Sequence, residues 1–433
     1  MNEGLQIESL WEELGHGSPE TRATYAALGI RLDDRWVTET DDRLLGRTRR
    51  HAPLPAYHFA EWLTWNWWRL RWEPFRSTQS WQLAHNMAAI GGGWIWPNLT
   101  IITDGSHLIL RPVPTDPRSS EPLRYLSSRS LFANADSFEA AINDFVLRIL
   151  DRLRGSDGRA TNLGALWNEL TTERADPRLS RFRKLEALLG WDPGEADDAL
   201  IEQLEADSEE FGIGAVEELA ANGAGERAPL TGLELIEIAG REGGGARPRD
   251  AATLGDGSHG FGPETPAWRR GVHAAKALRA TEKLGDNAIT DPVLCGLVGV
   301  IKGTTDRCTA RAPISFELDG PAGASVIVLR SGLVNARRFD LARILGDRIL
   351  EGRGAVLRPV TRSYTHRQKA QIGFAAELLC PVEALVAFSA QDLTEESYDD
   401  AADHFGVSTS VVRMQLLENR IIGCRNDQRL LQW

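Results

Sequence analysis

Apolar residues recur at helical spacing in the middle of the N-terminal half. Behind a cap at Asp136 and Ser137, one stripe consists of Phe138, Ile142, Phe145, Val146, Ile149 and Leu153. This period predicts a helix with one buried face. Further helices are predicted over residues 162–173, 179–189 and 197–222. Together they indicate a helical module over residues 131–222.

A different pattern, alternation of apolar and polar residues, predicts strands. Residues 99–111 alternate on either side of Asp104 and Gly105, and such an Asp-Gly pair is typical of a hairpin turn. Two more strands are predicted over residues 310–319 and 324–329. The fold class is therefore predicted to be α+β, in a chain of several domains.

Tryptophan is concentrated near the N-terminus, with nine of the fourteen between Trp36 and Trp96. The run from 57 to 72 has helical propensity and lies between prolines. In one helix, Trp65, Trp68 and Trp72 would share a face. A helix that is apolar on most of its surface is usually buried or lies in an interface. Residues 1–130 are predicted to form a tryptophan-rich α+β module.

Arginines interleave with these rings and leave a second interpretation open. They are Arg47, Arg49, Arg50, Arg69, Arg71 and Arg76. Cations beside aromatic rings are typical of a nucleic-acid surface, which combines phosphate contacts with base stacking. The candidate contacts are Arg69, Arg71, Trp68 and Trp72. A third interpretation is a protein partner anchored by the tryptophans.

Glycine-rich sequence over residues 223–264 has the composition of a linker, with one short helix predicted at 230–239. It separates the N-terminal half from a predicted domain over residues 265–433. Within that domain, residues 324–350 run from an apolar strand through a turn into an amphipathic helix. This strand–turn–helix order is also found in a known protein family.

The helix resembles the signature region of the ImmA/IrrE family of zinc-dependent peptidases, in which an Arg-Arg-Phe run precedes a helix reading Ala-His-Glu-Leu-Gly-His. This chain has the Arg-Arg-Phe run at 337–339, and the frame that follows reads Ala-Arg-Ile-Leu-Gly-Asp at 342–347. Two histidines four residues apart can bind one zinc ion, and the glutamate acts as general base on the bound water. Arg343, Ile344 and Asp347 cannot form this site. Arg343 and Asp347 are instead expected to pair at i,i+4, worth roughly 0.2–0.5 kcal/mol if exposed.

Residues 370–381 resemble the second signature of the family, Glu-Ala-Asn-x-Phe-Ala-Ala-x-Leu-Leu-Met-Pro. The packing residues are retained, among them Phe374, Leu378 and Pro381, but Ala370 stands where the third zinc ligand would be. The resemblance covers about residues 265–433. It implies a degenerate zincin-like domain, with a small sheet and helices, that lacks catalytic residues, metal and cofactor.

The end of this domain has the spacing of a helix-turn-helix, over residues 393–422. Ala402, Gly406 and Val412 occupy its small, turn and packing positions, and Ser408 is predicted to cap the second helix. Thr409 and Arg413 on that helix are candidate DNA contacts. Several acidic residues on the first helix would weaken binding to phosphate.

Charge, cysteine spacing and the first residues indicate in which compartment the protein is found. The 433 residues carry a net charge of −12, which argues against a protein coated in basic surface. The four cysteines are widely spaced without a Cys-x-x-Cys pair, so neither a zinc knuckle nor a disulfide framework is indicated. The first residues have neither the basic region nor the apolar core of a signal peptide. We therefore expect a reduced, cytoplasmic protein with no membrane segment. The oligomeric state stays open.

The sequence is compatible with three functions. The resemblance implies a pseudoenzyme that regulates or holds a protein partner, in the mobile-element, stress-response or antiphage setting associated with active relatives. One alternative is a nucleic-acid-binding protein that uses the arginine and tryptophan stretch or the helix-turn-helix. The other is a metallopeptidase with a relocated metal site, built on Asp347, His366 and Glu377.

Overall fold

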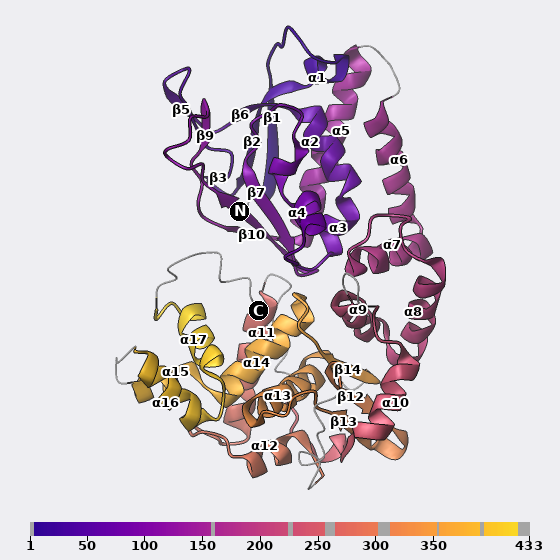
Figure 1. Ribbon diagram of the computed structural model, residues 1–433, viewed down its shortest axis with the longest axis vertical. Helices are drawn as coiled ribbons and strands as arrows, with labels where there is room; N and C mark the ends of the chain where they lie inside the picture. The colour runs from indigo at the N-terminus through magenta and orange to yellow at the C-terminus, as the bar shows by residue number, and fades with distance from the viewer. Residues whose placement is uncertain are drawn as a thin grey trace. The chain divides into compact units, whose positions relative to one another are not determined.

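The computed structural model describes residues 4–156, 161–223, 228–255, 265–301, 312–352, 355–389 and 394–422. The chain divides into two compact units, Met1–Asp197 and Asp198–Trp433. Each unit combines helices with small antiparallel sheets, which confirms the predicted α+β class (Figure 1).

The described strands of the first unit form three sheets. Four strands form the first, with β1 (Leu5–Trp11), β2 (Tyr25–Leu32) and β3 (Arg35–Trp36) in that order and β6 (Ala52–Pro55) also on β2. The second has the order β10 (Leu131–Asn134), β8 (His107–Val113), β7 (Asn98–Thr103), and the third has the order β5 (Arg47–Arg49), β4 (Thr40–Asp42), β9 (Leu123–Tyr125). The β7–β8 pair is the predicted hairpin. Its turn forms where Asp104 Oδ1 accepts the N–H groups of Ser106 and His107.

Seven helices are described in this unit. They are α1 (Pro19–Ala23), α2 (Ala56–Trp65), α3 (Trp67–Trp72), α4 (Gln79–His85), α5 (Ala135–Ser156), α6 (Asn162–Ala175) and α7 (Pro177–Leu189). The predicted stripe of α5 is buried from Phe138 to Leu153, and it belongs to one core that runs from Leu5 to Ala187. This core includes residues on both sides of position 130, where the sequence analysis placed the end of the first module.

The tryptophan run is not one helix, which corrects a sequence-based expectation. It breaks at Asn66, whose N–H and Nδ2 both donate to the Trp62 carbonyl, at 3.0 and 2.9 Å. As a result Trp65 is 56% exposed whereas Trp68 is buried, so the predicted common face does not form.

The second unit is built on one antiparallel sheet. Its order is β11 (Gly244–Ala246), β13 (Ser325–Val328), β12 (Ser315–Asp319), β14 (Leu357–Val360). Strand β11 lies inside the predicted linker 223–264, and α10 (Gly232–Glu242) precedes it. The described middle of that segment is therefore part of the folded unit, while 224–227 and 256–264 lie outside the described residues.

Nine further α-helices are described in this unit. They are α8 (Asp198–Phe211), α9 (Ile213–Asn222), α11 (Ala267–Thr281), α12 (Asp291–Val298), α13 (Val334–Glu351), α14 (His366–Leu379), α15 (Val382–Ser389), α16 (Glu395–Phe405) and α17 (Thr409–Glu418). Strand β13 and helix α13 form the strand–turn–helix predicted over residues 324–350. Helix α14 packs between α11 and α13, which are its main neighbours.

Among the described residues, no single helix has both the length and the apolar character of a membrane span. Helices α14 and α15 reach that threshold only when counted together, with a bend of 46° between them.

Candidate functional site

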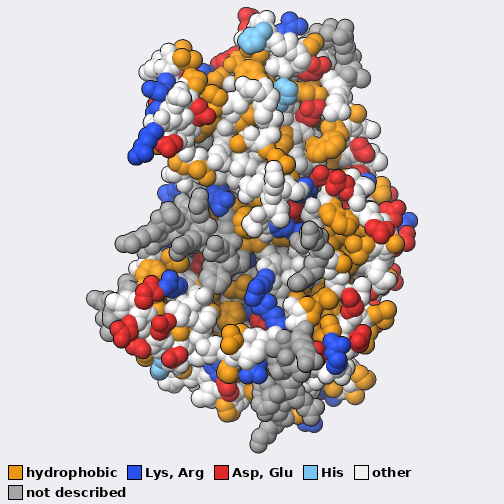
Figure 2. Space-filling view, viewed as in Figure 1, with side chains coloured by type: hydrophobic (Ala, Val, Ile, Leu, Met, Phe, Trp, Pro, Cys, Tyr) orange, Lys and Arg blue, Asp and Glu red, His pale blue; other side chains and the backbone are white. Residues whose placement is uncertain are grey.

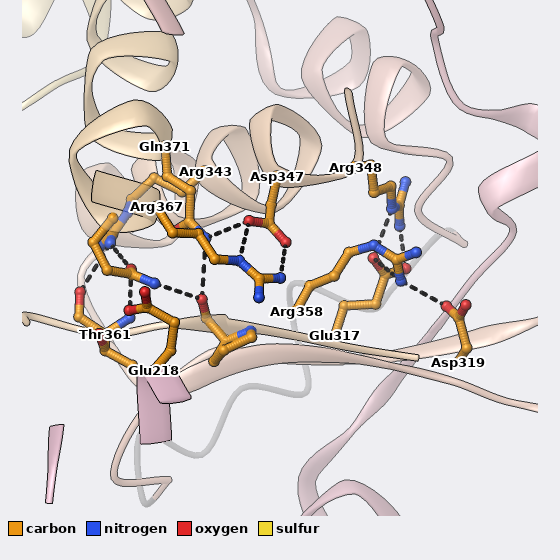
Figure 3. A network of polar contacts seen from close by, with 12 residues as sticks. Glu218, Glu317, Asp319, Arg343, Asp347, Arg348, Arg358, Thr361, Arg367 and Gln371 are labelled. Atoms are coloured by element: carbon orange, nitrogen blue, oxygen red, sulfur yellow. Dashed lines mark hydrogen bonds and ion pairs between the residues drawn. The ribbon is translucent and has the colours of Figure 1, made fainter. Parts of the chain in front are cut away.

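Helices α13 and α14 bring the four positions that the sequence analysis compared with a zinc site into the interior of the second unit. Arg343, Ile344 and Asp347 lie on α13, and Ala370 lies on α14, and all four are buried. The side chains around them form a polar network beside strand β14 (Figure 3). Because buried polar groups cost free energy unless they are paired, the partners of each group decide what the network can do.

Asp347 is held from α14 on both carboxylate oxygens. Arg367 Nε lies 2.8 Å from Oδ1, Arg367 Nη2 lies 2.6 Å from Oδ2, and Gln371 Nε2 donates to Oδ1 at 2.8 Å (Figure 3). The predicted pair between Arg343 and Asp347 is therefore wrong. The fork of Arg367 matches the two oxygens of a carboxylate, and the side chain of Asp347 is only 1% exposed.

Arg343 points instead toward the end of β14. Its Nη2 donates to the Thr361 carbonyl at 2.8 Å and to the side-chain oxygen of Gln368. Its closest carboxylate is Asp340, at 4.0 Å. Burial lowers the pKa of Arg343 to about 10, so the guanidinium stays charged at neutral pH.

Glu218 enters the same network from α9, and nothing in the sequence indicated it. Its side chain is buried, and Oε2 accepts a hydrogen bond from Thr365 Oγ1 at 2.9 Å. Burial raises the pKa of Glu218 to about 7, against the opposing effect of Arg367. The stretch that contains Glu218, residues 195–218, has ten carboxylates and no lysine or arginine, which is typical of a solvated face. The packing of α9 buries Glu218 in spite of this pattern.

A second set of ion pairs ties α13 to the sheet. Arg348 Nε lies 2.6 Å from Glu317 Oε2, and Arg358 Nη1 lies 2.8 Å from Asp319 Oδ1 (Figure 3). Ser325 Oγ also donates to Glu317, at 2.6 Å. These contacts join α13, β12, β13 and β14, so their role is to position the helix that carries Asp347.

The chemistry of the network differs from that of a peptidase site. Arginine has no lone pair to give a metal, both oxygens of Asp347 are already bonded, and Ile344 carries no proton. In the part of the chain that the structure describes, no group of three His, Cys, Asp or Glu side chains is arranged to hold a metal ion. The relocated set is also not assembled, because Glu377 bonds Gln415 Nε2 at 3.0 Å rather than Asp347.

In the first unit, the candidate nucleic-acid contacts turn out to be interior groups. Arg69 is 4% exposed, and it binds Glu73 at 2.7 Å and Asp192 at 3.1 Å. Arg71 is buried as well, and its Nε lies 2.6 Å from Glu139. Both cations are thus neutralised inside the fold, which corrects their assignment to a phosphate-binding surface.

The two candidate stacking rings are also occupied. Trp68 is buried, and its Nε1 donates to Glu173 at 2.8 Å. Trp72 is half-buried, with the Arg71 guanidinium 3.8 Å and the Lys184 ammonium 4.1 Å from its ring centroid. These intramolecular cation–π contacts take the place that a base would need.

Arg69 belongs to a buried group that the sequence did not reveal. His85, a lone histidine in the sequence, is buried, with Nε2 3.1 Å from Glu73 and Nδ1 2.9 Å from the Ile101 carbonyl. Its ring stacks on Trp81 at 4.1 Å. Although burial acts to raise the pKa of Glu73, the contacts from His85 and Arg69 hold it below its ordinary value. These contacts join the end of α3, helix α4 and strand β7.

The predicted helix-turn-helix is present. Helix α16 ends at Gly406, with a φ of 63°, and Ser408 caps α17. The turn is bound to α13, because Asn335 Nδ2 donates to the Val407 carbonyl at 2.9 Å and Arg338 Nε donates to the Gly406 carbonyl at 2.9 Å. The described tail is therefore an integral part of the second unit.

The DNA-contact candidates on α17 face acidic partners. Thr409 Oγ1 donates to Asp399 at 2.8 Å, and Arg413 pairs with Glu395. Figure 2 shows acidic side chains gathered over α16. The acids neutralise Arg413 and would repel phosphate, so this surface has little to offer a nucleic acid.

The chain was compared with protein-family models, curated proteins and solved structures, and none of the three comparisons gives a match. The likeness to ImmA/IrrE peptidases therefore depends on the sequence signatures at 337–347 and 370–381.

Proposed function

We propose that the second unit is a non-catalytic relative of the ImmA/IrrE zinc peptidases, and that the protein has a regulatory or scaffolding role. The observation that carries this proposal is the binding of Asp347 by Arg367 and Gln371. Asp347 stands where the second histidine of the peptidase helix would be. An internal ion pair thus occupies a position that a peptidase keeps for zinc.

Electrostatics support the same conclusion. A zinc site needs lone pairs that converge on one point from neutral or negative ligands. Here the guanidinium groups of Arg343 and Arg367 lie among the degenerate positions, and both side chains are buried. A divalent cation beside two buried positive charges would be repelled at close range.

By analogy with the family, we propose that the protein acts inside the cell, in a mobile-element, stress-response or antiphage process. We also propose that it binds a protein partner there. Of the tryptophans suggested as anchors, Trp65 remains accessible at 56% exposure. Trp62 lies next to it on α2 and donates from Nε1 to the Leu83 carbonyl at 3.4 Å, and Leu83 is also exposed. Nucleic-acid binding is not proposed, because its named contacts are buried or paired with acids.

A peptidase assay tests this proposal. The full chain is incubated with an unfolded protein substrate in added zinc or cobalt, next to the Asp347→Ala variant. We expect no cleavage above buffer by either protein. Cleavage by the natural sequence that a chelator stops and Asp347→Ala abolishes would overturn the proposal.

A further inference from the structure

We propose that Glu218 is a proton-controlled latch that fastens helix α9 to the first turn of helix α14. The latch depends on the contacts of Glu218 alone. It would operate whether or not the unit descends from a peptidase, so it does not rest on the function proposed above.

The latch is built at the beginning of α14. Thr365 is the N-cap of this helix, and its Oγ1 accepts the N–H of Gln368 at 3.3 Å while it donates to Glu218 at 2.9 Å. One hydroxyl thus connects the start of α14 to the carboxyl group on α9. The apolar neighbours Val216 and Leu219 bury α9 around this contact.

Three charged groups on helices α13 and α14 act on Glu218. Arg367 on α14 attracts its negative charge, Asp347 on α13 repels it, and Arg343 on α13 attracts it more weakly. Arg367 is already bonded to both oxygens of Asp347, so its charge is largely committed. Hydrogen bonds from Thr365 and Gln368 also favour the ionised form of Glu218, but burial outweighs these effects and makes the protonated form competitive near neutral pH.

The direction of the pH effect follows from this balance. Burial raises the pKa of Glu218 from its ordinary value of 4.5 to about 7 in the docked helix. A group that binds protons more tightly when docked favours docking below its ordinary pKa, and that advantage is lost as pH rises through the docked pKa. Helix α9 should therefore be held more firmly at pH 6 than at pH 8.

The ends of α9 allow such a movement. Gly212 precedes the helix with a φ of 93°, a conformation that favours glycine, and Gly223 is its C-cap. Glycine at both ends gives the backbone of this short helix freedom at the two points where it would have to bend to open. Opening would let water reach the ionised carboxylate.

Hydrogen exchange measured by mass spectrometry on the full chain tests the latch. Protection of peptides from residues 213–222 is compared at pH 6 and pH 8, after correction for the intrinsic exchange rate. We expect about tenfold lower protection at pH 8, because the docked carboxyl of Glu218 is mostly protonated at pH 6 and mostly ionised at pH 8, whereas in the open helix it is ionised at both. Protection of peptides from α13 should not change in this way, and these peptides serve as a control within the natural protein. Equal protection of α9 at both pH values would overturn the proposal.

Two variants sharpen the test. Glu218→Gln keeps the shape of the side chain without its titration, and it should remove the pH dependence in α9. Glu217→Gln, one residue away on the same helix and only half-buried, should keep it. A pH dependence that persists in Glu218→Gln would show that another group is responsible, against the proposal.

Discussion

Asp347 and Arg367 are the residues whose pairing distinguishes this interior from a metal site. Removal of either partner leaves the other charge buried without compensation, which typically costs roughly 3–5 kcal/mol. We expect that loss in the free energy of unfolding for Asp347→Ala and for Arg367→Ala, measured by urea denaturation. The double variant should lose clearly less than the sum of the two.

The exposed pair between Arg413 and Glu395 is the matched control for this cycle. Surface ion pairs contribute about 1 kcal/mol or less, and this pair lies on the outside of α16 and α17. Glu395→Ala should therefore change stability very little. Additive losses for Asp347 and Arg367 would mean that the two side chains do not interact as described.

Arg69 offers a test of the buried cations in the first unit. Arg69→Ala leaves Glu73 and Asp192 without their shared partner, so we expect a loss of roughly 3 kcal/mol or more. Arg47 is exposed, so Arg47→Ala should stay within about 0.5 kcal/mol of the natural sequence. If Arg69→Ala instead left stability intact and weakened salt-dependent binding of an oligonucleotide, the nucleic-acid interpretation would return.

Helices α11 and α14 cross with almost no space between their backbones. A Cβ at Gly271 would overlap the Ala370 carbonyl, and one at Gly373 would overlap the Trp268 carbonyl. We expect Gly373→Ala to reduce the free energy of unfolding by roughly 1–3 kcal/mol, because the helices must move apart. Thermal or urea unfolding measures this loss.

Gly240 in α10 is the control for that substitution. It also lies inside a helix, but nothing lies within 4 Å of the position of its Cβ. Gly240→Ala should stabilise the protein by about 0.5–1 kcal/mol through helix propensity alone. Equal effects at Gly373 and Gly240 would contradict the close crossing.

Helices and strands were predicted well where the signal for them is local in the sequence. The stripe that begins at Phe138 gives α5, the Asp104–Gly105 turn gives the β7–β8 hairpin, and Ser408 caps α17. Each of these signals lies within a few residues of the chain. The break at Asn66 was missed because a hydrogen bond of its side chain competes with the helical run.

Pairing between distant residues could not be predicted in this way. Asp347 had a suitable partner at i−4, yet Arg367 from the next helix reaches it with better geometry. Glu218 and Thr365 are 147 positions apart. The arginines and tryptophans around Arg69 form the same sequence pattern whether Arg69 binds a phosphate or Glu73. Burial decides between these roles, and burial is a property of the packed fold.

The two units have separate hydrophobic cores, which allows their stabilities to be followed separately. One core runs from Leu5 to Ala187 and the other from Ala246 to Leu416. Twelve of the fourteen tryptophans lie in the first unit, so intrinsic fluorescence reports mainly on its unfolding. Circular dichroism reports on both units. Arg69→Ala should therefore shift the fluorescence transition, and Asp347→Ala should shift mainly the dichroism.

The zinc content of the intact protein tests the central claim most directly. The full chain is purified from zinc-supplemented medium, its metal is measured by mass spectrometry, and its melting temperature is recorded with and without a chelator. We predict far less than one zinc per chain and no effect of the chelator, because both oxygens of Asp347 are bonded to Arg367. One zinc per chain, lost with the chelator together with stability and absent from Asp347→Ala, would contradict it.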